Sequence, residues 1–401
     1  MAPSLPNSAT SAPLDKAGVV SRITTRAWRD ENFAELLRTN AQAALIAEFG
    51  TVPDGFDNVT FRLQPADRVI TKPTSSGLRL RARPKREDRP LNVVVRRFLG
   101  VGELVVVLYT KRCQYQCTFC TLPSTSAHGD VSLTGIRDQM AAALDAAGDQ
   151  LSDVRQISLG NEGSILDERT LPREQLSYLL RACAALPAVE NIILETRPEF
   201  ATPSLLDELA DLAAPKRISL KIGLESADDR IRQRVLGKNM DLQVFERTVY
   251  DLGRRGIDLA SYVLVKADPR HCDAEGRADA IATCRYLKNL CQTSGIRLTL
   301  RVNAMYRAAG SRWAAWAKQS GWTPPSVFDL ADVMYAVADA ETPVYAGLSE
   351  EGLATPDGCM ESRGDFQSWA LRRLEDYNHS GDIALLRSVA HHRSRAGECS
   401  S

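Results

Sequence analysis

The stretch LVVVLYTKRCQYQCTFC, residues 104–120, decides the fold of this chain. It opens with six residues of strong β preference, and the loop that follows them holds Cys113, Cys117 and Cys120. A continuous apolar run of this kind predicts a strand buried on both faces, as in parallel sheets. The loop at the end of that strand therefore carries three potential metal ligands within eight residues.

Five further β-rich runs follow, and helical patterns separate them. This alternation predicts an α/β chain with a parallel sheet and outer helices, which right-handed crossovers wind into a partial (βα)6 barrel over residues 101–310. Functional residues of such barrels lie at the carboxyl ends of the strands. The predicted strands are 104–109, 154–159, 191–195, 217–222, 259–265 and 296–302, and the predicted helices are near 133–147, 173–186, 203–213, 227–255 and 275–291.

The segments on either side of the barrel have a different composition. Residues 1–14 are rich in Ser, Pro and Ala and predict a disordered tail, whereas residues 15–100 predict a helical segment followed by a basic arm. The arm is either a solvated extension on the next domain or a contact for a phosphate-bearing substrate. Residues 311–392 predict a mainly helical extension, with helices near 311–320, 328–340 and 365–390, and residues 393–401 predict a frayed tail. The basic residues of the arm are Arg79, Arg81, Arg83, Lys85, Arg86, Arg89, Arg96 and Arg97.

The composition excludes several classes of protein. Lys and Arg number 50 and Asp and Glu number 50, so the chain has no global electrostatic footprint for nucleic acid. It lacks the roughly 18 consecutive apolar residues that a membrane helix needs. The start has no basic region followed by an apolar core, so it does not resemble a secretory signal. We therefore expect a cytoplasmic protein without a membrane partner.

The three clustered cysteines have the spacing C-x3-C-x2-C. Thiolates are the usual ligands of iron–sulfur clusters, and three of them would leave one iron open to a small chelating ligand. Structural zinc is the alternative metal, but it requires four ligands that commonly come in C-x2-C pairs. A cysteine cluster with no metal at all is the remaining interpretation.

This motif, with Phe119 before the last cysteine and a βα repeat around it, resembles the radical S-adenosylmethionine (radical SAM) superfamily over roughly residues 100–310. The resemblance implies that Cys113, Cys117 and Cys120 hold a [4Fe–4S] cluster, that SAM chelates the open iron, and that Phe119 lies beside the adenine. It also implies reductive cleavage of SAM to a 5′-deoxyadenosyl radical that abstracts hydrogen from a substrate. Motifs on the later strands are similar to the branch that contains the catalytic subunit of Elongator and the archaeosine-biosynthesis enzymes.

The second and third strands end in such motifs. Gly160, Asn161 and Glu162 resemble a Gly-Gly-Glu turn, in which the glycine lets backbone approach SAM and the carboxylate accepts from its ammonium group. A plain strand-to-loop turn is the alternative. Glu195 and Arg197 stand in an Elongator-like Glu-Thr-Arg-Pro segment and would face SAM or the substrate at the barrel mouth. A purely structural ion pair between buried Glu and Arg is the alternative.

The last three strands also end in polar residues. By the resemblance, Glu225 would accept from the SAM ribose, with Ser226 beside it, and Lys238 would take the place of a residue that reaches the SAM carboxylate. Lys266 lies in a segment similar to archaeosine-biosynthesis enzymes and could contact SAM or a substrate acid. Asn303 would touch adenine or would be a satisfied polar cap. The neighbouring Arg230, Arg232 and Arg234 predict a solvated helix face.

The other cysteines form no C-x2-C pair. Cys272 stands beside His271 after the fifth strand, and we consider it a candidate catalytic donor of a hydrogen atom to a substrate radical. Cys284 and Cys291 are seven residues apart on a predicted helix and indicate core packing. An auxiliary cluster that includes Cys359 is an alternative to scattered thiols.

These patterns favour a radical SAM enzyme that acts on a small molecule, with a natural-product pathway as one setting. The implied partners are that substrate and an electron donor such as flavodoxin or ferredoxin; nucleic acid is not favoured. Three alternatives stay open: a radical SAM enzyme that modifies tRNA, one that acts on a peptide, and a non-catalytic iron–sulfur or zinc protein.

Overall fold

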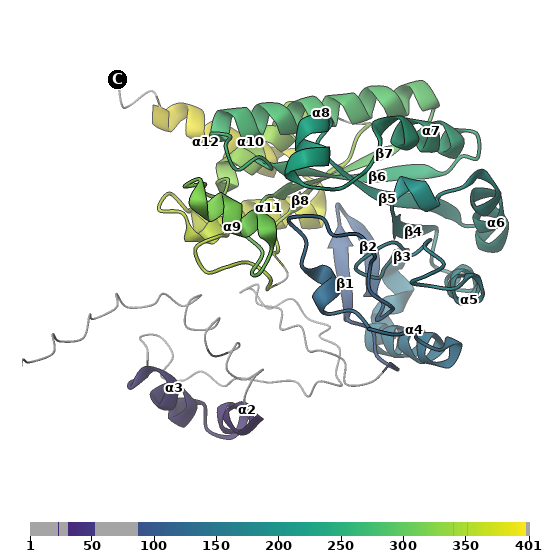
Figure 1. Cartoon of the computed structure of the whole chain (residues 1–401), viewed down its shortest axis with the longest axis horizontal. Helices are drawn as coiled ribbons and strands as arrows, with labels where there is room; N and C mark the ends of the chain where they lie inside the picture. Colours follow the sequence, from purple (N-terminus) through teal and green to yellow (C-terminus); the bar gives the residue numbers. More distant parts are fainter. Residues whose placement is uncertain (1–22, 24–30, 53–86, 340, 351, 398–401) are drawn as a thin grey trace, which may run out of the picture. The chain divides into compact units, whose positions relative to one another are not determined.

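A computed structural model describes residue 23 and residues 31–52, 87–339, 341–350 and 352–397 (Figure 1). The chain divides into two units, Met1–Pro65 and Ala66–Ser401. The predicted tail at 1–14 and the part of the basic arm before residue 87 lie outside the described residues. In the first unit, α2 (Glu31–Thr39) and α3 (Ala41–Phe49) bury a small apolar cluster that includes Leu37 and Leu45. They fall within the helical segment predicted from the sequence.

The second unit is built on one eight-stranded sheet in which the strands follow one another in chain order. β1 pairs antiparallel with β2, and every later pair is parallel. All six predicted strands are present, as β2 to β7. The prediction missed β1 because its arginines resemble the basic arm, and it missed β8 because that strand has four residues. The strands are β1 (Asn92–Phe98), β2 (Val101–Val107), β3 (Val154–Gly160), β4 (Asn191–Thr196), β5 (Arg217–Glu225), β6 (Asp258–Val265), β7 (Leu298–Ala304) and β8 (Val344–Gly347).

Helices α4 to α8 follow one another around the outside of this sheet (Figure 1). Side-chain caps fix several of their starts; Ser132, for example, accepts from the backbone N–H of Gly135 at 3.0 Å. These helices are α4 (Leu133–Ala147), α5 (Arg173–Ala184), α6 (Pro203–Ala213), α7 (Leu242–Gly253) and α8 (Asp273–Ser294).

The C-terminal extension is mainly helical, as predicted, but two boundaries differ. The single helix expected over 365–390 is divided at Gly381, whose left-handed backbone (φ 76°) ends α11. The tail expected from 393 is helical as far as Gly397, because α12 continues to that residue. The helices are α9 (Arg312–Gln319), α10 (Val327–Val337), α11 (Ser368–Ser380) and α12 (Ile383–Gly397).

The two faces of the sheet differ in chemistry. Side chains on the outer face, such as Leu104, Leu220 and Leu300, are fully buried in the main apolar cluster under the helices. The sheet curls so far that its two edge strands meet through side chains: the rings of Phe98 (β1) and Tyr345 (β8) stack with centroids 4.6 Å apart. The result is a nearly closed barrel with eight strands, not six.

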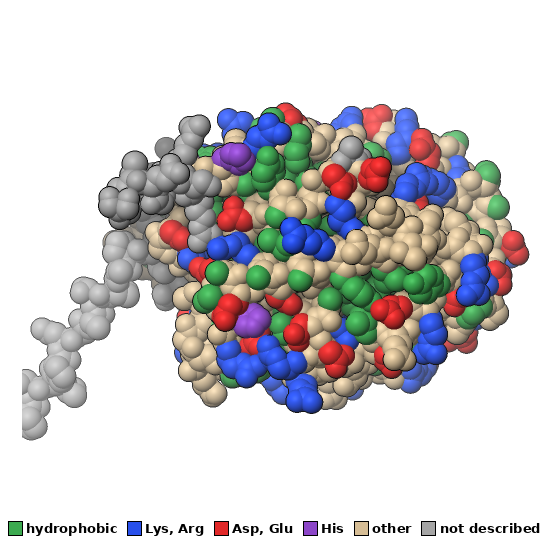
Figure 2. Space-filling model, turned by 90° about the horizontal axis from the view of Figure 1, so that it is seen from above, with side chains coloured by type: hydrophobic (Ala, Val, Ile, Leu, Met, Phe, Trp, Pro, Cys, Tyr) green, Lys and Arg blue, Asp and Glu red, His purple; other side chains and the backbone are tan. Residues whose placement is uncertain are grey.

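The surface carries both signs of charge. Figure 2 shows Lys and Arg interspersed with Asp and Glu over the face that it draws. Among the described residues, no helix is both long and apolar enough to cross a bilayer.

Candidate functional site

The cysteine loop leaves the carboxyl end of β2, as the sequence predicts. Its cysteines 113, 117 and 120 are half-buried, and none forms a disulfide. Thr118 anchors the loop: its backbone N–H donates to the carbonyl of Leu236 at 2.9 Å, and its hydroxyl donates to that of Val235 at 2.7 Å. The carbonyl of Thr118 accepts from the backbone N–H of Trp313 at 2.9 Å. The loop is therefore held between the π-helix Arg230–Val235 and the start of α9.

Two glycines allow the neighbouring segments to approach this loop. A Cβ on Gly163, in the turn after β3, would lie 3.0 Å from the Cβ of Cys113. A Cβ on Gly237 would lie 3.1 Å from the Cγ2 of Thr118, and Gly237 has a left-handed backbone (φ 60°). Glycine is needed at both positions because a larger residue would displace the cysteine loop.

The charges around the thiols suit a bound group that keeps them ionised. Burial raises the pKa of Cys120 to about 12, and the nearby thiols of Cys117 and Cys113 raise it further. Burial also raises the pKa of Cys113. Lys238 acts in the opposite direction at Cys120, and Arg197 does so at Cys113. Three neighbouring thiolates thus need more positive charge than two cations supply, and an iron–sulfur cluster would provide it.

The spacing of the sulfur atoms favours a cluster over a single ion. Ligand atoms of one zinc ion lie within about 4 Å of one another, given Zn–S bonds of about 2.3 Å. Among the described residues, the one group of three potential ligands within 4.8 Å of one another is Glu350, Cys359 and Glu361. The three loop cysteines do not form a group within this limit, as a single-ion site would.

Three predicted site residues share an unusual backbone. Glu162 (φ 59°), Glu225 (φ 69°) and Lys266 (φ 63°) all adopt left-handed conformations. They stand at or just after the ends of β3, β5 and β6, and each side chain is buried. Residues other than glycine rarely adopt this conformation, and strained positions of this kind cluster at functional sites.

Glu225 and Lys238 form a buried pair. Lys238 Nζ donates to Glu225 Oε1 at 2.9 Å, and both residues are less than a tenth exposed. A Cβ on Gly223 would lie 3.0 Å from Lys238 Nζ, so this glycine makes room for the pair. The proximity of Lys238 to Cys120 brings the end of β5 next to the cysteine loop.

Arg197 links β4 to the same region. Its guanidinium lies 3.7 Å from the ring centroid of Tyr115, in the cysteine loop, and Nη2 donates to the carbonyl of Lys238 at 2.8 Å. Arg197 pairs with Glu199 at 2.8 Å, whereas Glu195 pairs with Lys221 of β5 at 2.9 Å. The considered pair between Glu195 and Arg197 is therefore not formed, because β4 ends at Thr196 and the two side chains find separate partners.

The comparisons with known proteins agree with this geometry. A family model described as the Radical SAM superfamily matches residues 107–272, which include the cysteine loop and the ends of β3 to β6. Residues 107–272 of this chain are therefore similar to the radical SAM superfamily. Members of this superfamily are enzymes that use a [4Fe–4S] cluster and SAM, and the match indicates the same cofactors for this chain.

The individual relatives of this chain are distant. An uncharacterised protein of Methanocaldococcus jannaschii is 22% identical over 75% of this chain and 84% of its own length. Archaeosine synthase subunit beta of Methanosarcina acetivorans is 23% identical over 47% of this chain and 58% of its own length. The solved structure of Streptococcus suis SuiB bound to S-adenosylmethionine has a TM-score of 0.43 and 14% identity, and the similarity covers 64% of this chain and 54% of that one. The chain thus spans little more than half of the last two.

Other predicted residues of the radical SAM site are engaged by their own surroundings. Asn161 donates to the hydroxyls of Thr110 and Thr170 at 3.1 and 3.2 Å, and so fixes the turn after β3. Ser226 donates to Asp279 of α8 at 2.8 Å. Glu162 accepts from Ser126 at 3.4 Å and also from Thr125, both in the segment after Cys120.

Lys266, Asn303 and Phe119 lie on the β6–β7 side of the radical SAM site. Lys266 Nζ donates to Asp273 at 2.6 Å and to the carbonyl of Thr323 at 2.9 Å. The side chain of Asn303 lies against Gly347 of β8. Phe119 packs on a second apolar cluster, to which the rings of Trp313 and Trp322 belong. This cluster connects the cysteine loop to the segment after β7.

One expectation beside the site changes. Arg232 is fully buried, not solvated: it donates to the carbonyl of Met240 at 3.0 Å and forms an ion pair with Asp229 at 2.6 Å. The helix here is a π-helix, so the spacing of an ordinary α-helix does not predict correctly which of its side chains are buried. Cys272 is exposed and forms the N-cap of α8, where its backbone N–H donates to Glu275 at 2.8 Å.

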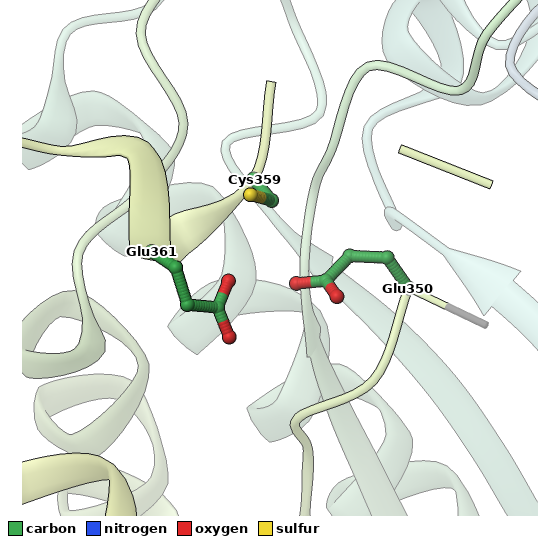
Figure 3. A group of neighbouring side chains, drawn as sticks. All are labelled: Glu350, Cys359 and Glu361. Atoms are coloured by element: carbon green, nitrogen blue, oxygen red, sulfur yellow. The ribbon is translucent and has the colours of Figure 1, made fainter. Parts of the chain in front are cut away.

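The remaining cysteines are scattered. Cys183, Cys284 and Cys291 are buried in the main apolar cluster, as expected for core residues. Cys359 faces Glu350 and Glu361 in the C-terminal extension (Figure 3). Burial and the neighbouring Glu361 raise the pKa of Glu350 to about 8, so a proton held between the two carboxyl groups accounts for their proximity.

Sequence reasoning missed a set of charged residues inside the barrel. Glu103, Lys221 and Arg301 are each at most 6% exposed and lie in the middle of apolar strands. The signal was present, because a charged residue within a buried strand requires a partner or a function. Arg96 belongs with them, since it pairs with Glu103 at 2.6 Å and is part of β1, not of a solvated arm.

Proposed function

We propose that this radical SAM enzyme holds its cluster on Cys113, Cys117 and Cys120 and abstracts hydrogen from a small metabolite. When bound, the cluster supplies one electron to the sulfonium of SAM, whose cleavage gives methionine and the 5′-deoxyadenosyl radical. The observation that carries the proposal is the anchored loop of three free, half-buried thiols at the carboxyl end of β2.

The chain's own residues would bind and orient SAM. Lys238, held by Glu225, is a point charge suited to the SAM carboxylate, and Glu162 is an acceptor suited to its ammonium group. Glu225 has a second oxygen for the ribose hydroxyls. Phe119 would pack beside the adenine. The other residues that we assign to SAM or substrate are Gly160, Asn161, Glu195, Arg197, Ser226, Lys266 and Asn303, with Cys272 as the candidate hydrogen donor.

A small substrate agrees with the size of the barrel and with its charge. The interior of an eight-stranded barrel accommodates at most one small ligand besides its own side chains. Equal numbers of basic and acidic residues, 50 of each, provide no overall attraction for a phosphate backbone. We further expect a flavodoxin or ferredoxin as electron donor, and action in the cytoplasm, in a biosynthetic pathway such as that of a natural product.

The direct test is anaerobic reconstitution with iron and sulfide, followed by reduction in the presence of SAM and detection of 5′-deoxyadenosine by mass spectrometry. The wild-type chain should form it, and the triple variant Cys113→Ala, Cys117→Ala, Cys120→Ala should not. The matched control replaces three cysteines that lie away from the loop, Cys183→Ala, Cys291→Ala and Cys359→Ala, and should retain the cluster. Stoichiometric zinc in place of iron would refute the proposal.

A second candidate is modification of tRNA, which the similarity to archaeosine synthase subunit beta favours. Retention on tRNA that declines steeply with salt would support this candidate. Replacement of Arg81, Arg83 and Arg86 by Gln should then weaken retention. Retention that is absent at low salt would leave the small metabolite as the substrate.

A further inference from the structure

The inner face of the barrel carries charges where such barrels usually carry branched apolar side chains. We call five of these residues the interior charge belt: Arg96 (β1), Glu103 (β2), Glu195 (β4), Lys221 (β5) and Arg301 (β7). Arg301 Nη2 donates to Glu103 Oε1 at 3.3 Å. β7 and β2 are not neighbours in the sheet, so this ion pair spans the interior of the barrel.

The belt is not electrically balanced. Its carboxylates are already engaged: Glu103 pairs with Arg96 at 2.6 Å, and Glu195 pairs with Lys221 at 2.9 Å. Glu103 must then serve Arg301 as well. Three cations thus face two carboxylates, and one positive charge is in excess within a largely buried space. A buried charge without a full counter-charge is costly unless a ligand supplies it.

Arg301 has an unused donor. It is 5% exposed, and its Nε–H has no acceptor among the described residues. The guanidinium lies 4.6 Å from the ring centroid of Phe98 and 5.4 Å from that of Tyr345. Aromatic rings that stack on the face of a guanidinium leave the N–H groups at its edge free to donate. A carboxylate, which is planar and has two oxygens, matches this edge.

The belt reaches toward the mouth of the barrel. Glu195 is the next-to-last residue of β4, and its side chain is 30% exposed, so solvent reaches this part of the interior. A Cβ on Gly160 would lie 3.1 Å from Glu195 Oε2, and thus glycine leaves room at the end of β3. Lys221 precedes Glu225 by four residues on β5, which places it about 13 Å deeper along the strand. A small molecule anchored at the belt would extend toward the proposed SAM residues.

We propose that the interior charge belt binds the carboxylate of a small-molecule substrate, with Arg301 as its main anchor; this inference rests on the proposed function. One excess positive charge matches one carboxylate, whereas a phosphate dianion would exceed it. The carboxylate could belong to a free metabolite or to a substituent on a larger substrate. The structure favours a free metabolite, because the barrel interior holds one small ligand.

Thermal unfolding of the reconstituted holoenzyme tests the inference. The probes are acetate, propionate, succinate and L-glutamate, each compared with its uncharged amide at equal ionic strength, and bulk tRNA is a separate arm. At least one acid should raise the melting temperature in a saturable manner, and its amide should not. No stabilisation by any acid, or equal stabilisation by an amide, would overturn the proposal. Stabilisation by tRNA alone would overturn the free-metabolite source.

A conservative variant assigns the effect to Arg301. Arg301→Lys keeps the charge but loses the planar fork, and should weaken binding of the acid at least tenfold. Arg297→Lys, at an exposed arginine just before the same strand, should leave it unchanged. Equal affinity for the acid in both variants would show that Arg301 is not part of the site. The comparison of acid with amide uses the wild-type chain, so it holds even if a variant does not fold. If acids fail to bind while 5′-deoxyadenosine still forms, this inference fails and the proposed function stands. If an acid binds but no 5′-deoxyadenosine forms, the proposed function fails and the carboxylate site stands.

Discussion

The outer and inner faces of the barrel sheet are both buried, yet they have different chemistry. On β5, Leu220 and Ile222 face the helices, whereas Lys221 between them faces the interior and pairs with Glu195. The outer face could be exchanged for other apolar residues of similar volume with the fold preserved. The inner face could not, because each charge depends on a specific partner on another strand. Burial alone therefore does not distinguish structural residues from functional ones. The residue that each buried side chain pairs with makes this distinction.

Removal of one interior carboxylate should have the largest effect on stability. Glu103→Gln leaves Arg96 and Arg301 without their shared counter-charge, and we expect the free energy of unfolding to fall by about 3–5 kcal/mol. Equilibrium denaturation in urea measures this change. Glu190→Gln, which breaks an exposed pair with Arg155, is the matched control and should change stability by less than about 1 kcal/mol. Similar values for both variants would contradict a charge-dependent interior.

The same carboxylate predicts a pH dependence. Burial would raise the pKa of Glu103, but Arg96 and Arg301 outweigh burial and lower it to about 2. The folded state therefore binds this proton less readily than the unfolded state, whose value is near 4.5. The stability that Glu103 provides is complete above about pH 5 and is lost as the pH falls toward 2. Glu103→Gln should flatten the stability curve in that acidic range.

An outer-face truncation should cost about 2–5 kcal/mol and leave binding unchanged. Leu220→Ala creates a cavity under the helices next to Lys221, without removing a charge. We expect a lower urea midpoint and an unaltered affinity for the small carboxylate identified above. A loss of affinity equal to that of Arg301→Lys would show that the two faces are not independent.

A half-buried carboxylate beside a second carboxylate should behave in the opposite way to Glu103. Burial and the neighbouring Glu361 raise the pKa of Glu350 to about 8. The folded state binds this proton more tightly than the unfolded state does, so its contribution is complete below about pH 4.5 and is lost as the pH rises to 8. Glu350→Gln should remove this decline in stability between these limits. An unchanged slope in the variant would contradict the shared proton.

An exposed ion pair should have the smallest effect. Lys111 and Asp130 lie 2.8 Å apart, but their side chains are 39% and 75% exposed. Lys111→Ala should therefore change the free energy of unfolding by less than about 1 kcal/mol. A larger loss, measured by the same denaturation experiment, would mean that this pair positions the cysteine loop.

The sequence predicted the features that depend on local pattern. The apolar runs of β2 to β7 and the cysteine motif at the end of β2 could be predicted because each is formed by residues that are close together in the sequence. The pairing of Glu195 with Lys221 and of Glu103 with Arg301 could not be predicted, because the partners are far apart in the sequence and only the folded barrel brings them together. Arg96 was misplaced in a basic arm for the same reason: only its partner on β2 makes it an interior residue. The sequence held one local indication of these interior charges, namely a charged residue in the middle of an apolar strand.

The measurement that tests the central claim most directly is electron paramagnetic resonance of the reduced, reconstituted chain, together with its iron and sulfide content. The account predicts about four irons and four sulfides per chain and a cluster signal that changes when SAM is added, because three cysteines leave one iron open. The triple variant of Cys113, Cys117 and Cys120 should show neither. A wild-type signal that does not respond to SAM, or one that survives in the triple variant, would contradict the account.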